Sequence, residues 1–458
     1  MYTYQPISSE NDASYIAGLC DRIERSLDEG QMPADPFRDD RVFRAEMERI
    51  FTRSWVFVAH ETEIPNSADF VTRRIGLDPV IVTRTRDGGI NVLLNHCRHR
   101  GTPVCAEDAG NTTHFRCPYH GWTYKNNGEF VGAPEMQMAY GKRPDPKKWG
   151  LIRAPRVEVT HGFIFACLSD DAPSLQEYLA GAGWMFDVLF GLHPDGLRVL
   201  APPERFVIRA DWKSGAENFS GDSYHVGTAH YSATLSGFAA GDLRNNGNRA
   251  AGFLLDNGHS FVGHRLPEWF GPEFQFWGYP PELRAQMDLS NLDETQKELL
   301  TTLPITIGTI FPNFSFVRFP SASAPGRFPM AYTDIRLWQP LEPGVMEMWH
   351  WQLEYAFMPE EYQRESYIAG QFGFGAGGMI EQDDTVLWEG VARFAGSPWA
   401  RRDGIPMHYK QKRVEPDPDW KGPGQHFSTT YGEYMQEGFW RRWIKDMRDH
   451  AREANQDG

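Results

Sequence analysis

A short stretch of the chain, residues 97–120, concentrates side chains that bind metals. It reads CRHRGTPVCAEDAGNTTHFRCPYH and contains three cysteines and three histidines. Cys97 and His99 open it as Cys-x-His, and Cys117 and His120 close it as Cys-x2-His, with 17 residues between the two pairs. This feature constrains the fold strongly, because two loops must meet around whatever group these four side chains bind.

Two kinds of metal group accept two cysteines and two histidines. In a Rieske 2Fe-2S centre, two histidines replace two cysteines on one iron, and the reduction potential rises because the oxidised cluster carries no net charge. A structural zinc site is the alternative, although zinc modules more often pair like ligands. Gly101, Pro103, Pro118 and Gly121 suit tight turns beneath a buried cluster. The spacing therefore favours the iron–sulfur interpretation.

A second group of histidines lies in residues 217–230, ENFSGDSYHVGTAH. On a helix, Asp222 and His225 would be neighbours about 60° apart, since each residue turns the helix by about 100°. His225 and His230 would lie about 140° apart, so both imidazoles reach one ion only if the helix bends or breaks. We expect this to happen at Gly227. A surface pair of histidines without a metal is the alternative.

A third candidate ligand comes much later in the chain. In GFGAGGMIEQDDTVLWEG, Glu381, Asp383 and Asp384 begin an expected helix after a glycine-rich turn. Two histidines and one carboxylate on one face of an iron leave positions open for O2, as in non-haem Fe(II) oxygenases. Acidic residues at a helix N-terminus are also favoured by the helix dipole without any metal. The carboxylates alone therefore do not decide between a metal site and a helix start.

Hydrophobic periodicity divides the chain into a β-rich part and a mixed part. Alternating, strand-like segments lie at 55–64, 69–75, 79–86, 90–97, 161–168, 304–319 and 332–357. Helical segments lie at 10–29, 359–372, from Ile380 onward and at 432–453. This order predicts an α+β fold, in which a small antiparallel β domain is inserted in a larger domain whose antiparallel sheet is flanked by helices.

Length, charge and cysteine content limit the other classes of function. A chain of 458 residues is longer than one ordinary domain, so we expect two. The net charge of -15 and the lack of a long Lys/Arg block argue against a nucleic-acid partner. No apolar run approaches bilayer length and no secretory signal opens the chain, so we expect a cytoplasmic protein without a membrane partner. Five sparse cysteines do not form a disulfide framework.

Together with RVFRAEMERIFTRSWVFVAHETEIP, FPNFSF and EQDD, the two constellations resemble the large, α subunit of Rieske non-haem iron aromatic-ring-hydroxylating dioxygenases, of the naphthalene, biphenyl and polycyclic-hydrocarbon kind. The resemblance runs over nearly the whole chain. It implies a Rieske domain at 41–170 and a catalytic iron domain at 1–40 and 171–458. The implied 2Fe-2S ligands are Cys97, His99, Cys117 and His120. The implied mononuclear iron ligands are His225, His230 and Asp384, with Asp383 as the main rival for the third place.

The resemblance also assigns residues around the iron. Asn218 matches the family's asparagine beside the iron, and Asp222 matches its bridging aspartate. In that family three α subunits form a ring in which one cluster faces the next subunit's iron. Asp222 is therefore expected to link His225 to His120 of a neighbouring subunit. Capping of its own helix is the alternative role for Asp222. Chain length and EQDD are similar to the α3β3 group, so we also expect a small β subunit.

The same resemblance places four residues around the substrate: Phe219, Val226, Phe374 and Ile380. Each of them alone could be plain core. An apolar, aromatic-lined cavity suits an uncharged ring. No Arg or Lys lies next to these positions, which favours a neutral aromatic hydrocarbon. A variable loop within 232–300 is expected to cover the site.

The function implied by the resemblance is that of a terminal oxygenase. It would add both atoms of O2 to one face of an aromatic ring and give a cis-dihydrodiol. Electrons would arrive from NADH through a reductase and a ferredoxin. The chain has no Gly-x-Gly-x-x-Gly after a strand, in agreement with NADH binding to a partner. Two alternatives stay open: a Rieske monooxygenase or demethylase on the same scaffold, and a non-catalytic, zinc-bound interaction protein.

Overall fold

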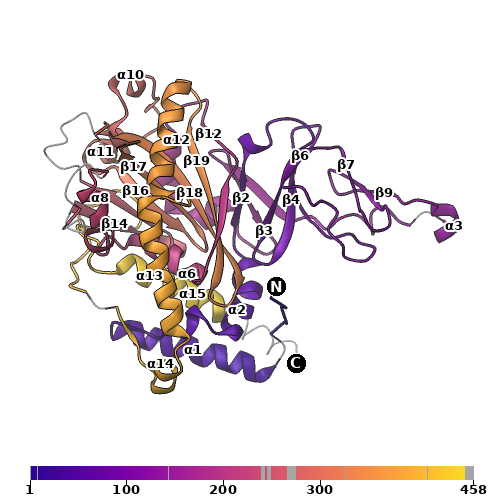
Figure 1. Ribbon diagram of the computed structural model, residues 1–458, viewed down its shortest axis with the longest axis horizontal. Helices are drawn as coiled ribbons and strands as arrows, with labels where there is room; N and C mark the ends of the chain where they lie inside the picture. The colour runs from indigo at the N-terminus through magenta and orange to yellow at the C-terminus, as the bar shows by residue number, and fades with distance from the viewer. Residues whose placement is uncertain are drawn as a thin grey trace. The chain divides into compact units, whose positions relative to one another are not determined.

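The computed structural model divides the chain into two compact units (Figure 1). The smaller unit is Phe51–Leu175, and the larger unit combines Met1–Ile50 with Gln176–Gly458. The expected domain boundaries at residues 41 and 170 stay a prediction. The structure describes residues 2–7, 9–142, 144–238, 243–244, 249–265, 275–324, 326–327, 329–409 and 411–448. Within these ranges no helix is both long enough and apolar enough to cross a membrane.

The smaller unit consists of three antiparallel sheets of short strands, as its alternating sequence predicts. The strand orders are β10-β11-β2, β5-β4-β3-β6 and β7-β8-β9. The elements are β2 Val56–His60, β3 Asp69–Ile75, β4 Asp78–Arg84, β5 Ile90–Leu94, β6 Ala109–Asn111, β7 His114–Arg116, β8 Thr123–Lys125, β9 Phe130–Gly132, α3 Met136–Tyr140, β10 Arg156–Thr160 and β11 Phe163–Cys167. Its buried core contains Phe70, Leu93, Phe115, Trp122 and Phe130.

In the described residues, the larger unit combines helices with a nine-stranded antiparallel sheet and a small two-stranded sheet of β1 Gln31–Met32 and β20 Met407–His408. The strand order is β12-β19-β18-β17-β16-β15-β14-β21, and β13 also pairs with β19. The strands are β12 Leu197–Val199, β13 Glu204–Ile208, β14 Ala250–Leu254, β15 Ser260–His264, β16 Ile305–Ile310, β17 Phe314–Ser321, β18 Met330–Glu342, β19 Val345–Tyr355 and β21 Gln425–Phe427. A sheet with helices packed on it is the α+β architecture that the sequence predicts.

The helices of the larger unit come both before and after the long strands. They are α1 Glu10–Asp28, α2 Asp40–Glu46, α4 Leu175–Leu179, α5 Gly181–Phe190, α6 Trp212–Gly221, α7 Val226–Ala229, α8 Tyr231–Leu235, α10 Pro281–Arg284, α11 Glu294–Thr302, α12 Glu360–Phe374, α13 Met379–Ala395, α14 Pro398–Asp403 and α15 Tyr434–Arg448. The helix α12 packs on β17, β18 and β19, and α13 contacts α12, α6 and α8. In Figure 1, α12 and α13 are the two orange helices that follow each other beside the sheet.

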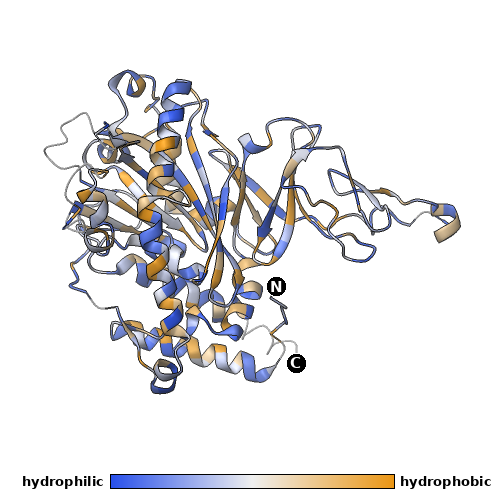
Figure 2. Cartoon of the chain, viewed as in Figure 1, coloured by the Kyte–Doolittle hydropathy of each residue, from blue (hydrophilic) through white to orange (hydrophobic). Residues whose placement is uncertain are grey.

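The two faces of the large sheet pack against different helices because side chains alternate along each strand. On β17, the ring of Phe316 lies 5.7 Å from that of Phe190 in α5, measured between centroids. On the opposite face, Trp338 of β18 packs against Phe219 of α6 and Trp388 of α13. Figure 2 shows hydrophobic and hydrophilic residues interleaved along these strands. The face with α6 and α13 carries the site described next.

A buried ionic cluster fixes the start of α6. Lys213 Nζ lies 2.7 Å from Glu46 Oε1 and 2.5 Å from Asp211 Oδ1. The Glu46 carboxylate also accepts hydrogen bonds from the indole N–H groups of Trp212 (2.9 Å) and Trp443 (2.7 Å). Asp211 caps the helix, because its carboxylate accepts the backbone N–H of Lys213 at 3.0 Å. This helix leads directly into the histidine segment.

Candidate functional site

The helical backbone is interrupted twice between Asp222 and His230. The helix α6 ends directly before Asp222, whose ψ of 87° is not helical. The Asp222 Oδ1 atom accepts hydrogen bonds from the backbone N–H groups of Tyr224 (3.0 Å) and His225 (3.2 Å). A second break at His230 separates α7 from α8. The bend expected at Gly227 is therefore wrong: the helix stops earlier, because the Asp222 carboxylate takes the place of helix carbonyls as the acceptor.

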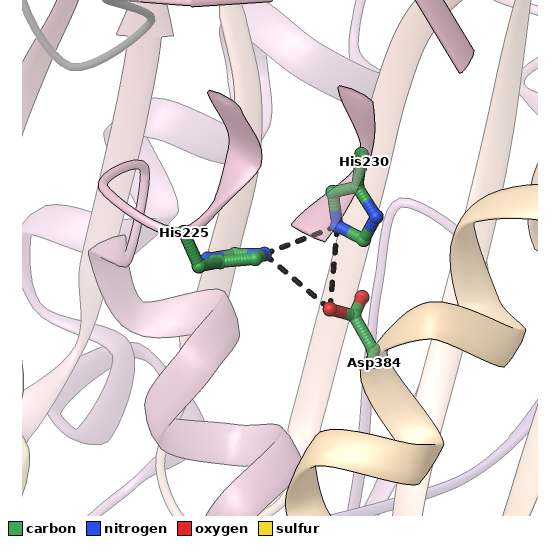
Figure 3. Close-up of side chains that lie close together, drawn as sticks. All are labelled: His225, His230 and Asp384. Atoms are coloured by element: carbon green, nitrogen blue, oxygen red, sulfur yellow. Dashed lines mark hydrogen bonds and ion pairs between the residues drawn. The ribbon is translucent and has the colours of Figure 1, made fainter. Parts of the chain in front are cut away.

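These breaks let both imidazoles point at one carboxylate from the first turns of α13 (Figure 3). The Nε2 atoms of His225 and His230 are 3.1 Å apart. Asp384 Oδ1 lies 3.4 Å from Nε2 of His225 and 3.2 Å from Nε2 of His230. The side chains of His230 and Asp384 are only 4% and 3% exposed. Three ligand atoms thus converge from segments that are far apart in the sequence.

The donor set of this triad fits an iron ion. Asp384 Oδ1 is buried and has no hydrogen-bond partner within the described ranges. Burial raises the pKa of Asp384, but the two imidazoles outweigh burial and hold it below its usual value. Burial likewise lowers the pKa of His225, and Asp222 and Asp384 more than reverse this effect. The site therefore favours a cation in contact with the carboxylate, and two histidines with one carboxylate suit non-haem Fe(II).

Asp383 and Glu381 have different partners from Asp384. Asp383 Oδ2 lies 3.6 Å from Nδ1 of His230, on the side of the ring away from the triad, and accepts a hydrogen bond from the Ser232 hydroxyl at 3.2 Å. The Glu381 side chain is fully buried and accepts hydrogen bonds from the Arg336 guanidinium at 3.2 and 3.3 Å. The resemblance ranked Asp384 ahead of Asp383, and of these three carboxylates the structure brings only that of Asp384 to both Nε2 atoms.

Asp222 contacts the back of the first imidazole. Its Oδ2 lies 3.2 Å from Nδ1 of His225, so the two residues meet across the helix break rather than on one helical turn. The Asp222 side chain is 36% exposed, and burial is outweighed by His225 so that the pKa of Asp222 is lowered. Asp222 also borders a second cavity with Glu217 and Glu433, and burial raises the pKa of Glu217 to about 8. The Asp222 carboxylate thus accepts backbone N–H groups after the end of α6 and also contacts the imidazole of His225, a candidate metal ligand.

A cavity adjoins the triad and is lined by all four residues expected around the substrate. Phe219, Val226, Phe374 and Ile380 border it, and so does Asn218. None of the described residues that line it is Lys or Arg. The Arg336 guanidinium packs against two aromatic rings of the lining, 4.7 Å from the ring centroid of Phe219 and 4.4 Å from that of Phe374. The lining therefore suits an uncharged, apolar ligand.

Sequence reasoning did not predict the other lining residues of this cavity one by one. Ser223, Phe238 and Leu243 lie outside the sheet, and the strands contribute His264, Thr306, Ile307, Val317, Phe319 and Ser321. The alternation on β17 gives a partial signal, since Val317, Phe319 and Ser321 share one face of the strand. Parts of the loop expected at 232–300, namely 239–242, 245–248 and 266–274, lie outside the described residues.

In the smaller unit, the two Cys/His loops have the same pattern of backbone hydrogen bonds. The N–H groups of Cys97 and Cys117 each donate to the carbonyl five residues later, at 2.9 and 2.8 Å. Gly101 and Gly121 each donate back to the carbonyl of their cysteine, at 2.8 and 3.0 Å. Both glycines have positive φ, 77° and 69°, which glycine adopts without a steric cost. The repeated turn holds the two cysteines in the same backbone setting, whereas His99 stands two residues after its cysteine and His120 three residues after its own.

The side chains of these loops fit a cluster with two cysteines and two histidines. Cys97 and Cys117 are buried, and the rings of His99 and His120 lie 4.4 Å apart, measured between centroids. Nδ1 of His99 is buried without a hydrogen-bond partner in the described part of the chain. Burial raises the pKa of the Cys117 thiol, and the neighbouring Cys97 raises it further. All five cysteines are free thiols, so both cysteines of the loops are available as ligands, and two cysteines with two histidines are the ligand set of a Rieske cluster.

Comparisons with known families agree with the two sites. Residues 54–144 match the Rieske [2Fe-2S] domain, and residues 192–437 match the catalytic domain of the ring hydroxylating alpha subunit. The second match alone covers more than half of the chain. The chain belongs to the ring-hydroxylating alpha-subunit family. The resemblance read from the motifs is thereby confirmed, and the family implies a 2Fe-2S cluster and a mononuclear iron where zinc was the alternative.

Relatives of this ring-hydroxylating alpha subunit include enzymes with different reactions. The N,N-dimethyl phenylurea N-demethylase subunit alpha of Sphingobium sp. (strain YBL2) is 55% identical and aligns over 99% of both chains. The large oxygenase component of naphthalene 1,2-dioxygenase from Pseudomonas aeruginosa is 34% identical over 88% of this chain and 89% of that one. The crystal structure of naphthalene 1,2-dioxygenase from Rhodococcus sp. bound to indole gives a TM-score of 0.88 at 35% identity, over 96% and 99% of the two chains. The subunit is therefore a Rieske oxygenase.

Proposed function

We propose that this ring-hydroxylating alpha subunit is the oxygenase component of an N-demethylase. Its substrate is an uncharged aromatic compound with an N-methyl group, and N,N-dimethyl phenylureas are the first candidates. One observation carries the proposal: identity to the phenylurea demethylase subunit is 55% over 99% of the chain, against 34% over 88% for the naphthalene dioxygenase component. The demethylase alternative drawn from the sequence thereby moves ahead of cis-dihydroxylation.

The reaction inserts one oxygen atom of O2 into a C–H bond of the N-methyl group. The hydroxymethyl product then loses formaldehyde as its C–N bond breaks, and the nitrogen gains a proton. Substrate, O2, two electrons and two protons thus give the N–H product, formaldehyde and water. When bound, the Rieske cluster supplies single electrons and the mononuclear Fe(II) activates O2.

We assign the metal ligands as the family motifs imply. Cys97, His99, Cys117 and His120 hold the cluster, and His225, His230 and Asp384 hold the mononuclear iron. Asp222 keeps the Nδ1 side of His225 occupied at 3.2 Å, so that Nε2 faces the metal. Asn218 stands at the border of the substrate cavity beside these ligands.

The cavity residues hold the substrate and exclude water. Phe219, Val226, Phe374 and Ile380 offer apolar surface for an aromatic ring. A substrate with a carboxylate finds no Lys or Arg among the described lining residues, so it would be buried without a counter-ion. The proposal of an uncharged aromatic substrate follows from this lining.

The proposed electron supply and assembly follow the family. Electrons come from NADH through a reductase and a ferredoxin, which bind as separate partners. Three copies of the chain form a ring, and a small β subunit completes an α3β3 assembly. In this ring Asp222 accepts from His225 and from His120 of a neighbouring copy, which couples the cluster of one copy to the iron of the next. The partial exposure of Asp222 supports such a contact.

Cis-dihydroxylation of an aromatic hydrocarbon is the second candidate function. The TM-score of 0.88 with the naphthalene dioxygenase and the apolar cavity support it. In that reaction both oxygen atoms of O2 enter one face of the ring, and no formaldehyde forms. The two candidates therefore differ in products that are easily measured.

The test uses the purified subunit with a compatible reductase and ferredoxin, NADH and oxygen-18-labelled O2. The panel contains N,N-dimethyl phenylureas and neutral hydrocarbons of one to four rings. We expect one formaldehyde and one N-monomethyl product for each O2 consumed with the ureas. Doubly labelled diols from hydrocarbons, with no formaldehyde from any N-methyl compound, would overturn the demethylase proposal in favour of the second candidate.

A further inference from the structure

The turn that joins α12 to α13 lies between residues of the substrate cavity and of the triad (Figure 1). Phe374, the last residue of α12, and Ile380, in the first turn of α13, both line the cavity. Asp384 follows on α13 and completes the triad. The connecting residues 375–378 read Gly-Ala-Gly-Gly, and glycine restricts the backbone less than any other residue. Contacts with the rest of the fold must therefore help to fix this turn.

Glu204, the first residue of β13, contacts this turn from a distant part of the sequence. Its Oε2 atom accepts the backbone N–H of Ala376 at 3.2 Å, and the two residues are 172 positions apart. The Gln371 amide, in the orientation that satisfies its hydrogen bonds, donates to Glu204 Oε1 at 3.0 Å from the last turn of α12. One carboxylate thus contacts both the end of α12 and the turn that follows it.

Glu204 stands at one end of a row of charged side chains on one face of the sheet. Glu204 on β13 and Arg336 on β18 are both Cα partners of His350 on β19, so the three side chains share that face. Nδ1 of His350 lies 3.7 Å from Glu204 Oε2, and its Nε2 lies 3.3 Å from Oδ1 of Asp334. Asp334 lies 3.8 Å from Arg336, whose guanidinium pairs with Glu381 at 3.2 Å. Acidic and basic groups therefore alternate from Glu204 to the first turn of α13.

Burial makes this row of charges hard to rearrange. The side chains of His350, Asp334, Arg336 and Glu381 are 0% exposed, and that of Glu204 is 35% exposed. Burial lowers the pKa of His350, but Asp334 and Glu204 more than reverse this effect and raise it. The pKa of Glu204 is lowered, chiefly by His350. Both shifts favour the charged pair, and buried charges are stable only next to partners, so the row holds the Glu204 carboxylate in place.

We propose that Glu204 is a positioning residue that sets the width of the substrate cavity. It fixes the turn at Ala376, and the other end of the charged row fixes the start of α13 at Glu381. Phe374 and Ile380, which flank the turn, are thereby held in place in the cavity lining. Without the Glu204 contacts the glycine-rich turn can move, so the cavity should accommodate wide ligands and bind narrow ligands less tightly. The inference concerns the cavity rather than the chemistry, so it applies to both candidate reactions.

Hydrogen–deuterium exchange, followed by mass spectrometry, tests whether Glu204 fixes the turn. In the iron-loaded enzyme we expect Glu204→Ala to speed the exchange of amides in 375–382 by about 10-fold. Gly378 and Gln382 are diagnostic, because their N–H groups donate to the carbonyls of Gly375 and Gly378 and exchange faster only if the turn itself opens. Peptides from α5, which packs on the opposite face of the sheet, should exchange as in the wild type.

Dissociation constants, measured by calorimetry without electron donors, test whether the turn sets the cavity width. The narrow and wide ligands are 1,1-dimethyl-3-phenylurea and 1,1-dimethyl-3-(2-naphthyl)urea, and toluene and naphthalene form a second pair without the urea group. We expect Glu204→Ala to weaken the narrow ligand of each pair by about 10-fold and the wide ligand by less than about 2-fold. Glu204→Gln keeps an oxygen that accepts the Ala376 N–H, so the ratio of the two constants should change by only about 3-fold.

Glu347→Ala is the matched control. Glu347 lies on β19 and accepts a hydrogen bond from the Trp349 indole N–H within the same strand at 2.9 Å, so its loss should change neither the exchange of 375–382 nor the ligand ratio. Wild-type exchange and ratio in Glu204→Ala, or equally faster exchange in α5, would overturn the proposal. Faster exchange of the turn with an unchanged ratio would overturn the role in cavity width. A changed ratio without formaldehyde release from the ureas would leave the role of Glu204 standing while the demethylase function fails.

Discussion

The two candidate metal sites of this ring-hydroxylating alpha subunit are assembled in opposite ways. The Cys/His loops lie within 24 residues of one another, and each is closed by its own backbone hydrogen bonds. The triad takes His225 and His230 from the α6–α8 segment and Asp384 from α13, which meet only because these helices pack together. The first site therefore depends on local turns, and the second depends on the packing of the larger unit.

The sites also differ in exposure. The cysteines of the loops are buried, but His120 is exposed and His99 is partly exposed. In the triad, His230 and Asp384 are almost fully buried next to an apolar cavity. Exposed histidines suit a group that exchanges electrons with partners, whereas a dry site strengthens electrostatic interactions and protects reactive chemistry. Changes in the larger unit should therefore affect the triad while leaving the loops intact.

Removing the triad carboxylate should give the largest separation between the two sites. We expect Asp384→Asn to lose bound iron and to lower turnover by on the order of 1,000-fold, because the single negatively charged ligand of the triad becomes a neutral amide. The visible and EPR spectra of the cluster should not change. Asp383→Asn is the matched control, with an expected loss of about 10-fold, since Asp383 contacts only the far side of His230. Iron loss in the control but not in Asp384→Asn would make Asp383 the ligand.

The packing that supports the triad can be broken without touching a ligand. Arg336→Met leaves the Glu381 carboxylate fully buried at the start of α13 without its ion-pair partner. We expect the free energy of unfolding to fall by about 3–5 kcal/mol, measured with urea. Arg336 also lies 3.8 Å from the buried carboxylate of Asp334, which keeps His350 as a partner at 3.3 Å. The double variant Arg336→Met with Glu381→Leu should therefore recover most of this loss, because Glu381 no longer leaves an unpaired buried charge. A single variant as stable as the wild type would mean that this pair does not support α13.

The same variant should show a defined pH dependence. In the wild type, burial outweighs Arg336 and raises the pKa of Glu381 to about 6. Without Arg336 this pKa rises further, so the folded variant binds a proton that the unfolded chain loses above about pH 4.5. Its stability should therefore fall as pH increases from 5 to 8, and the difference from the wild type should grow over that range.

Asp222 tests whether the two sites act together in turnover. Asp222→Asn keeps a side-chain acceptor for the helix cap but removes the charge beside His225. We expect both metals to stay loaded and substrate-dependent O2 uptake to fall by about 100-fold. Iron and acid-labile sulfide analysis checks the loading, and an oxygen electrode measures the uptake. Near-normal uptake would show that Asp222 does not link the sites.

The difference in assembly also explains what the sequence could and could not predict. The cluster ligands could be predicted from the sequence because the two loops repeat a local turn with fixed spacing, at Cys97–Gly101 and at Cys117–Gly121. The α+β class followed from periodicity alone. The helix break at Asp222 was misplaced, because the sequence does not show that a carboxylate will compete for backbone N–H groups.

Tertiary packing explains the residues that the sequence did not reveal. His264 and Thr306 lie on neighbouring strands and meet the helix residues only when the sheet packs against them. Ser223 stands within a motif that draws attention to Asp222 and His225, and only the structure shows that it lines the cavity. The resemblance favoured Asp384 over Asp383, but spacing alone could not separate the two, since both follow the same turn.

The smallest effect is expected in the loops, from loss of one hydroxyl group. The backbone N–H of Arg98 donates to Tyr124 Oη at 3.0 Å, so the tyrosine proton is free to point at Cys97 Sγ, 3.3 Å away. Such a hydrogen bond is stronger to the reduced, more negative cluster. Tyr124→Phe should therefore lower the reduction potential by roughly 45 mV, which corresponds to about 1 kcal/mol for one electron.

Protein-film voltammetry measures this potential, and iron analysis of the triad is the internal control. Because Tyr124 lies in the smaller unit, mononuclear iron content and substrate affinity should equal those of the wild type. Phe130→Leu is a matched control, because it changes the same core without removing a hydrogen bond and should leave the potential unchanged. An unchanged potential in Tyr124→Phe would show that the hydroxyl does not tune the cluster, and would leave burial and the two histidines as the groups that set it.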